Sequence, residues 1–127
     1  LEQLGEFDGP FARLLEDLAD RGLLESTLLL VNSEFGRTPH INQYCGRDHW
    51  GTSWSVVVGG CGIQNGGVFG ATNENGIEVV DGEVNGAQLF HTYLQALGID
   101  SRDSFEVGGR PMPKADPAFD AIEELLA

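Results

Sequence analysis

Apolar residues early in the chain recur at helical spacing and then give way to an uninterrupted apolar run. Residues 8–10 (DGP) form a helix start signal, with the aspartate as cap, and apolar positions repeat every three or four residues across 11–18. Gly22 is predicted to end this helix. The run at residues 27–33 (TLLLVNS) predicts a strand buried on both faces of a parallel sheet. Helix, short link and buried strand together predict an α/β fold.

A second β region follows this strand. Residues 55–60 (SVVVGG) form a short β-branched run that predicts a strand. The short segments 68–72 and 77–80 flank the tetrapeptide 73–76 (NENG), and Asn-Gly is a strong hairpin signal because both residues tolerate positive φ. We therefore expect a small antiparallel hairpin excursion from the main sheet.

The chain becomes helical again from Asn85, and Gly98 is predicted to end that helix. Its predicted apolar face comprises Leu89, Phe90, Tyr93, Leu94 and Leu97. His91 falls on the other side, so we expect its ring to be solvated. Beyond the helix, residues 101–115 are rich in Gly and Pro and are predicted to be irregular. Residues 116–117 (DP) are predicted to cap a short acidic helix.

The charge balance narrows the range of partners. The chain has 20 Asp and Glu residues against 7 Lys and Arg residues, a formal net charge of -13. Such a surface repels phosphate backbones and anionic lipid headgroups, so we expect no nucleic acid and no membrane surface as a partner. The apolar runs are also far shorter than the roughly 18 to 20 residues of a membrane span. The oligomeric state is not predicted by these features.

The first residues of the sequence suggest that it is part of a longer protein. Residue 1 is a leucine and the only methionine is Met112, so we expect residues 1–127 to be part of one domain whose amino-terminal part lies elsewhere. A basic start and an apolar stretch are missing, so we expect that no signal peptide begins at residue 1. The compartment is left open, with a periplasmic or secreted location expected if an export signal precedes residue 1.

A carboxylate and an imidazole follow the predicted strand 27–33. The strand runs directly into Glu34, and the loop 45–51 (CGRDHWG) supplies Asp48 and His49. Open α/β sheets bind ligands just beyond the carboxyl ends of their strands. Carboxylate oxygens and imidazole nitrogens are the usual ligands of catalytic divalent metals, so Glu34, Asp48 and His49 are candidate ligands of Zn²⁺, Mn²⁺ or Ca²⁺. The alternative is that they are solvated loop charges and a structural imidazole.

Further polar side chains flank these candidate ligands. Arg37 and Arg47 can each hold an anionic substrate group bidentately, and the alternative for both is an ion pair on a very acidic chain. The structural alternative weighs more for Arg37, whose neighbours Gly36 and Pro39 suggest a rigid turn. His40 is either a spare ligand or substrate contact, or a surface residue.

Two stretches around these residues, 33–39 (SEFGRTP) and 46–50 (GRDHW), resemble the DUF1501 family, an uncharacterised family of the alkaline phosphatase and sulfatase superfamily. Further similar motifs follow in order at 70–76 (GATNENG), 79–84 (VVDGEV), 89–100 (LFHTYLQALGID) and 109–113 (GRPMP). The resemblance spans almost the whole chain, which is similar to the carboxy-terminal part of such proteins.

The resemblance implies a fold and a site. It implies an alkaline-phosphatase-like three-layer α/β sandwich with a metal site at its strand ends, and hydrolysis of sulfate or phosphate esters through a Ser, Thr or modified Cys nucleophile. Glu34 and His49 are implied as metal ligands, with Asp48 as a ligand or as the acceptor that orients the His49 ring. In that superfamily the strand usually ends in Asp-His or Asp-Asn, so Phe35 stands where a second ligand is usual.

These features are compatible with two functions. In the first, the chain is part of a metal-dependent hydrolase-like protein that acts on a small anionic ester. Because the nucleophile of such enzymes is implied to precede residue 1, we expect no catalytic residue in this chain and no turnover by the chain alone. The second is a non-catalytic binding or scaffold domain that kept the fold and lost the two-metal site, a possibility motivated by Phe35.

Overall fold

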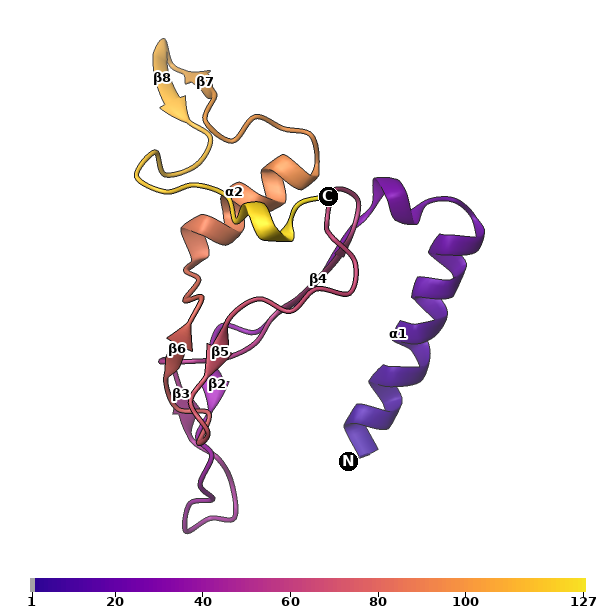
Figure 1. Cartoon of the computed structure of the whole chain (residues 1–127), viewed down its shortest axis with the longest axis vertical. Helices are drawn as coiled ribbons and strands as arrows, with labels where there is room; N and C mark the ends of the chain where they lie inside the picture. The colour runs from indigo at the N-terminus through magenta and orange to yellow at the C-terminus, as the bar shows by residue number, and fades with distance from the viewer. Residues whose placement is uncertain (1) are drawn as a thin grey trace.

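The computed structural model describes residues 2–127, which combine α-helices with short antiparallel strands (Figure 1). In chain order the elements are α1 (Glu2–Asp20), η1 (Leu24–Ser26), β1 (Leu28–Val31), β2 (Gly36–Arg37), β3 (His49–Trp50), β4 (Val57–Gly60), β5 (Ala71–Thr72), β6 (Val79–Asp81), α2 (Gly86–Ala96), β7 (Ser104–Val107), β8 (Arg110–Pro113) and η2 (Glu123–Leu125). The described strands pair as four two-stranded sheets: β1 with β4, β2 with β3, β5 with β6 and β7 with β8. The mixed helix and strand content agrees with an α/β chain.

Helix α1 extends further toward the amino terminus than predicted. It runs through Pro10, and Phe7 stacks on Phe11 with ring centroids 5.0 Å apart. Residues four apart are neighbours on a helix surface, so this contact stabilises helical structure both before and after Asp8. The predicted start at Asp8 is therefore wrong. Gly22, with a φ of +66°, follows the helix and ends it as predicted.

Strand β1 pairs antiparallel with β4, from Leu28 opposite Gly60 to Val31 opposite Val57. The prediction of a parallel sheet is wrong for this pair. Burial on both faces is also not found, because Leu30 is 46% exposed. An apolar run indicates that both faces of a strand suit an apolar environment, but it carries no information on the direction of the neighbouring strand.

The β5–β6 hairpin confirms the prediction made from the Asn-Gly signal. Ala71 lies opposite Asp81, and Gly76 has a φ of +68° in the turn. The side-chain oxygen of Asn73 accepts a hydrogen bond from the backbone N–H of Ile77 at 3.1 Å. The turn residues therefore provide both the positive φ and the side-chain acceptor that a tight hairpin uses.

The segment predicted to be irregular contains a further hairpin, β7–β8. Phe105 lies opposite Met112 in its register, and Gly108 and Gly109 have φ values of +58° and +76°. Two successive residues with positive φ form the two-residue connection that matches the twist of antiparallel strands. Figure 1 shows this hairpin projecting beyond α2. The Gly-Gly pair was the signal that the sequence interpretation missed.

Helix α2 begins as predicted and buries a different face from the one predicted. Asn85 caps it through a capping box with Gln88, in which each side chain accepts from the other residue's backbone N–H. His91 is 1% exposed, whereas Phe90 is 47% exposed. The prediction that the His91 ring is solvated is therefore wrong. The histidine faces inward because later segments of the chain supply partners for both its ring nitrogens.

Those partners are Ser101 and Asp116. His91 Nδ1 lies 2.7 Å from Ser101 Oγ, and His91 Nε2 lies 2.8 Å from the backbone oxygen of Asp116. A carbonyl oxygen only accepts, so Nε2 carries the proton and, in the neutral ring, Nδ1 accepts from the Ser101 hydroxyl. Ser101 is itself fully buried. The ring therefore connects α2 to the loop after it and to the carboxy-terminal segment.

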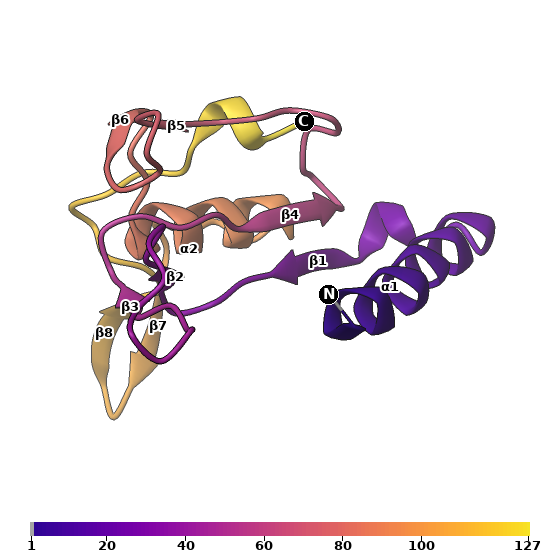
Figure 2. The same cartoon turned by 90° about the horizontal axis from the view of Figure 1, so that it is seen from below.

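The core lies where α2 meets the carboxy-terminal segment and the loop after β4. Its buried apolar residues are Cys61, Ile63, Ala96, Ala115 and Ile122. The predicted short acidic helix after Asp116 is not formed, because residues 116–119 make a turn and the helical segment beyond them is η2. In Figure 1 α1 and α2 lie on opposite sides of β4, and Figure 2 shows β1 and β4 running in opposite directions between α1 and the rest of the chain.

Candidate functional site

The β2–β3 hairpin brings the two candidate ligand loops together. After β1 the chain passes through Glu34 and enters β2. In the β2–β3 register Gly36 lies opposite Trp50, and Arg37 lies opposite His49. A Cβ on Gly36 would lie 2.3 Å from the backbone oxygen of Ser53, closer than real Cβ atoms come. Gly36 is thus required here by the close approach of two backbones rather than by a sharp turn. This approach fixes the segment containing Glu34 beside the segment containing His49.

The Phe35 and His49 rings stack at the base of this hairpin. Their centroids are 3.8 Å apart and their planes are inclined by 28°. The guanidinium carbon of Arg37 lies 5.3 Å from the Phe35 centroid, within the range of a cation–π contact. Phe35 therefore orients the imidazole and holds a cation beside it, a role that the sequence interpretation did not foresee. The carboxylate of Glu34 belongs to the residue directly before this cluster.

The loop between β2 and β3 is held by a network centred on Asn42. Its side-chain oxygen accepts from the backbone N–H groups of Tyr44 at 2.9 Å and Gly46 at 3.1 Å. Its side-chain nitrogen donates to Asp48 Oδ1 at 2.8 Å. At the loop base, Thr38 is 4% exposed and its Oγ accepts from the Asp48 N–H. The Asp48 carboxylate is thus partly used in shaping the loop, and it retains a second oxygen.

Arg47 uses its guanidinium inside the same loop. Its Nη1 donates to the backbone oxygen of Thr38 at 2.7 Å and also to that of Pro39. Arg37 in turn donates from Nη1 to the backbone oxygen of Arg47 at 3.3 Å. Each arginine keeps further N–H donors and is exposed, so each can still contact an anion. Arg37 lies beside the stacked rings, because its guanidinium contacts the Phe35 ring.

His40 lies in the loop and is exposed. Its backbone oxygen accepts from Thr38 Oγ at 3.1 Å, which ties the start of the loop to the hairpin. Among residues 2–127 the His40 ring forms no hydrogen bond or ion pair with Glu34, Asp48 or His49. His40 therefore remains a predicted substrate contact whose ring the structure leaves in solvent.

The candidate ligands do not form a complete metal centre by themselves. In the part of the chain that the structure describes, no group of three or more His, Cys, Asp or Glu side chains is arranged to hold a metal ion. Glu34, Asp48 and His49 are all exposed. A catalytic divalent metal commonly has three protein ligands and an open position. The hairpin thus offers at most part of such a ligand set, and the identity of a bound metal stays a prediction.

Asn42 and Phe35 are the site residues whose roles the sequence interpretation missed. An asparagine in a loop favours an Asx turn, because its short side chain can accept from the backbone N–H two residues on, as Asn42 does from Tyr44. The stacking of Phe35 on His49 had no such local signal, since the two residues are far apart in sequence and meet only when β2 and β3 pair.

Comparison with known families and structures gives one match. The model of a family described as protein of unknown function (DUF1501) matches residues 1–126. No curated protein and no solved structure matches the chain. Within residues 2–127, neither α-helix combines the length and apolar character required to cross a bilayer.

Proposed function

The chain belongs to the DUF1501 family of proteins of unknown function, and from that premise we propose that its β2–β3 hairpin forms one edge of a metal-dependent hydrolase site for sulfate or phosphate esters. The proposal includes membership of the alkaline phosphatase and sulfatase superfamily and its three-layer sandwich. The observation that supports it best is the packing of Phe35 on His49, which holds an imidazole next to the Glu34 segment.

The roles of the hairpin residues follow from their chemistry. Glu34 and His49 would hold a divalent ion, and Asp48, already bonded to Asn42 through one oxygen, would support it with the other. Arg37 would attract the anionic group of the ester, because its guanidinium is exposed beside the stacked rings. A bound divalent metal supplies charge neutralisation in such reactions. Since these residues do not complete a ligand set, no chemical step is assigned to them.

A non-catalytic binding or scaffold domain is the second candidate function. The absence of a three-ligand group from residues 2–127 favours it, as does the use of one Arg47 nitrogen and one Asp48 oxygen within the loop. In this alternative the network around Asn42 serves to present a rigid loop. The two functions differ in whether Glu34 and His49 bind metal together.

Calorimetric titration of Zn²⁺, Mn²⁺ and Ca²⁺ into the full chain separates these functions. We expect Glu34→Ala and His49→Ala each to weaken binding of the preferred metal at least about tenfold, because each removes one ligand of a small set. Glu74→Ala is the matched control, since it removes an exposed carboxylate from the β5–β6 turn and should leave the affinity unchanged. Equal affinities for all variants would contradict the hydrolase proposal and favour the scaffold.

A further inference from the structure

The turn of the β5–β6 hairpin is bound to the segment that begins in β3, and the two hairpins lie together in Figure 1. The indole Nε1 of Trp50 donates to the backbone oxygen of Ile77 at 3.0 Å. Three residues after Trp50, Ser53 Oγ donates to the backbone oxygen of Gly76, also at 3.0 Å. Two side chains of one segment therefore bind two successive carbonyl groups of one turn. Attachment at two points restricts both the separation and the relative rotation of the hairpins.

The turn sets the position of these two carbonyl groups through its own hydrogen bonds. The backbone oxygen of Asn73 accepts from the Gly76 N–H at 2.9 Å, and the Asn73 side-chain oxygen accepts from the Ile77 N–H at 3.1 Å. Asn73 therefore holds both of the residues whose carbonyl oxygens bind Trp50 and Ser53. The turn is a preformed pair of acceptors, and Asn73 is the residue that shapes it.

The two donors lie next to the stacked rings of Phe35 and His49. Trp50 directly follows His49 in β3. The cross-strand partner of Trp50 is Gly36, which directly follows Phe35. Ser53 is 6% exposed, and its backbone oxygen comes so close to Gly36 that no Cβ fits there. The pair Gly36–Trp50, which the β5–β6 turn holds, is thus the immediate neighbour of the stacked pair.

The indole and the imidazole lie on opposite faces of β3, because successive side chains of a strand alternate in direction. The Trp50 indole is bound to the turn on one face. On the other face the exposed His49 ring packs on Phe35. A rotation of β3 that broke the indole hydrogen bond would therefore also tilt the imidazole away from Phe35.

We propose that Trp50 and Ser53 are positioning residues for His49, and that they hold its ring on Phe35 by fixing the β2–β3 hairpin to the β5–β6 turn. Both residues act through His49 and not as ligands. The use of this ring as a metal ligand rests on the proposed function, whereas the effect of the two hydrogen bonds on the ring does not. The β5–β6 turn, far from His49 along the chain, thereby becomes part of the candidate site.

Proton NMR of the His49 ring in the full chain tests this positioning without metal. The ring current of Phe35 shifts the protons of a ring stacked on it upfield. We expect Trp50→Phe, which removes the indole N–H and keeps an aromatic ring, to abolish most of that upfield shift. Trp54→Phe makes the same change at a residue that is 45% exposed and whose indole N–H donates no hydrogen bond within residues 2–127. It should leave the His49 signals unchanged.

Substitutions of Asn73 extend the test to the turn, and they keep it decisive if Trp50→Phe does not fold. Asn73→Ala removes the side-chain acceptor for the Ile77 N–H, so the upfield shift of the His49 ring should fall. Asn73→Asp keeps an acceptor oxygen at that position and should restore the shift. Neither variant changes an aromatic ring, so any change in the His49 signals reports the position of its ring. The amide resonances of α2 show whether each variant is folded.

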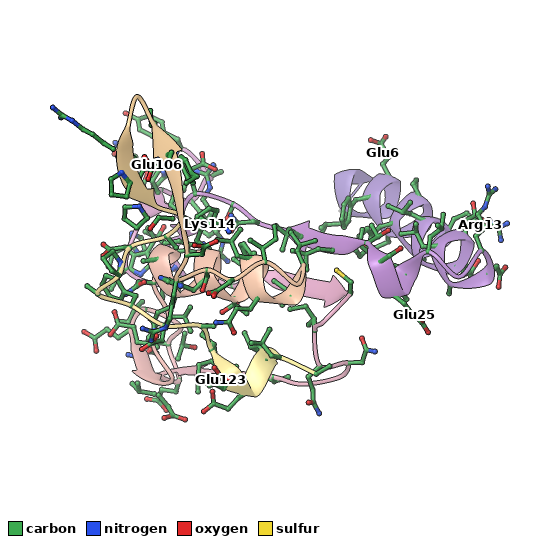
Figure 3. The ribbon with its side chains drawn as sticks, turned by 90° about the horizontal axis from the view of Figure 1, so that it is seen from above. Glu6, Arg13, Glu25, Glu106, Lys114 and Glu123 are labelled. Atoms are coloured by element: carbon green, nitrogen blue, oxygen red, sulfur yellow. The ribbon has the colours of Figure 1, made fainter. Side chains whose placement is uncertain are left out.

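Calorimetric titration of Mn²⁺ into the same variants separates this proposal from the metal site. We expect Trp50→Phe to weaken Mn²⁺ binding about tenfold, the lower end of the effect of groups that orient a metal ligand. Glu25→Ala should leave the affinity unchanged, because Figure 3 shows Glu25 close to α1 with its side chain pointing away from the ribbon.

The two readouts together distinguish the possible failures. A wild-type chain that binds no Mn²⁺, with the His49 shift still lost in Trp50→Phe, would contradict the metal site and support the positioning role. His49 signals that are unchanged in Trp50→Phe and Asn73→Ala, or that change equally in Trp54→Phe, would overturn the positioning role. Equal Mn²⁺ affinities of the wild type and Trp50→Phe, despite a lost shift, would overturn its importance for the site.

Discussion

Gly62→Ala should destabilise the chain by about 3–4 kcal/mol, measured by urea unfolding, which makes it one of the most damaging single substitutions. Gly62 follows β4 with a φ of +64°, and a Cβ there would lie 2.4 Å from the backbone oxygen and 2.7 Å from the Cα of Ala96. The left-handed conformation alone costs an alanine about 1–2 kcal/mol. The remainder comes from forcing the β4 loop away from α2, where the backbone of Ala96 cannot yield without moving the helix.

Gly66→Ala is the matched control for this effect. Gly66 has a similar φ of +74°, and a Cβ there meets nothing within 4 Å. Its substitution should cost only the conformational part, about 1–2 kcal/mol. Equal losses at Gly62 and Gly66 would show that the β4 loop does not pack on α2 as described.

His91→Ala should cost about 3 kcal/mol in the same unfolding measurement. The substitution leaves a cavity in place of a ring that is 1% exposed, and it removes the hydrogen bonds from that ring to the buried Ser101 Oγ and to the Asp116 oxygen. The lost hydrogen bonds and the lost packing both contribute to the destabilisation. The effect should reach beyond α2, because the ring joins that helix to the loop after it and to the carboxy-terminal segment.

Phe90→Ala provides the comparison, because Phe90 is the adjacent residue and has the larger side chain. It is 47% exposed, so its truncation should cost about 1 kcal/mol. Hydrophobicity alone predicts the opposite order, with the phenylalanine more important than the histidine. A larger loss for Phe90→Ala than for His91→Ala would therefore show that α2 buries the face predicted from sequence instead.

Features set by neighbouring residues could be predicted from the sequence. Asn85 caps α2, Gly76 turns the β5–β6 hairpin and Gly22 follows α1. In each case the signal and the structure it produces lie within a few residues of each other. Membership of the DUF1501 family could also be predicted, because its motifs are short and ordered along the chain.

Features that depend on distant partners could not be predicted. The direction of β1 is set by β4, and the burial of His91 is set by Ser101 and Asp116, which become its neighbours only after folding. The same holds at the candidate site, where Phe35 counted against metal binding because it is no ligand. Its position against His49 shows a positioning role that spacing along the chain does not reveal.

Paramagnetic broadening by Mn²⁺ in the NMR spectrum of the full chain tests the central proposal most directly, because it reports where the ion lies. The net charge of -13 attracts cations in general, so a local measurement is needed to separate a site from diffuse binding. At low Mn²⁺ the resonances of Glu34 and His49 should broaden first, followed by those of Asp48. Broadening spread evenly over exposed acidic residues such as Glu74 would contradict the proposed metal site.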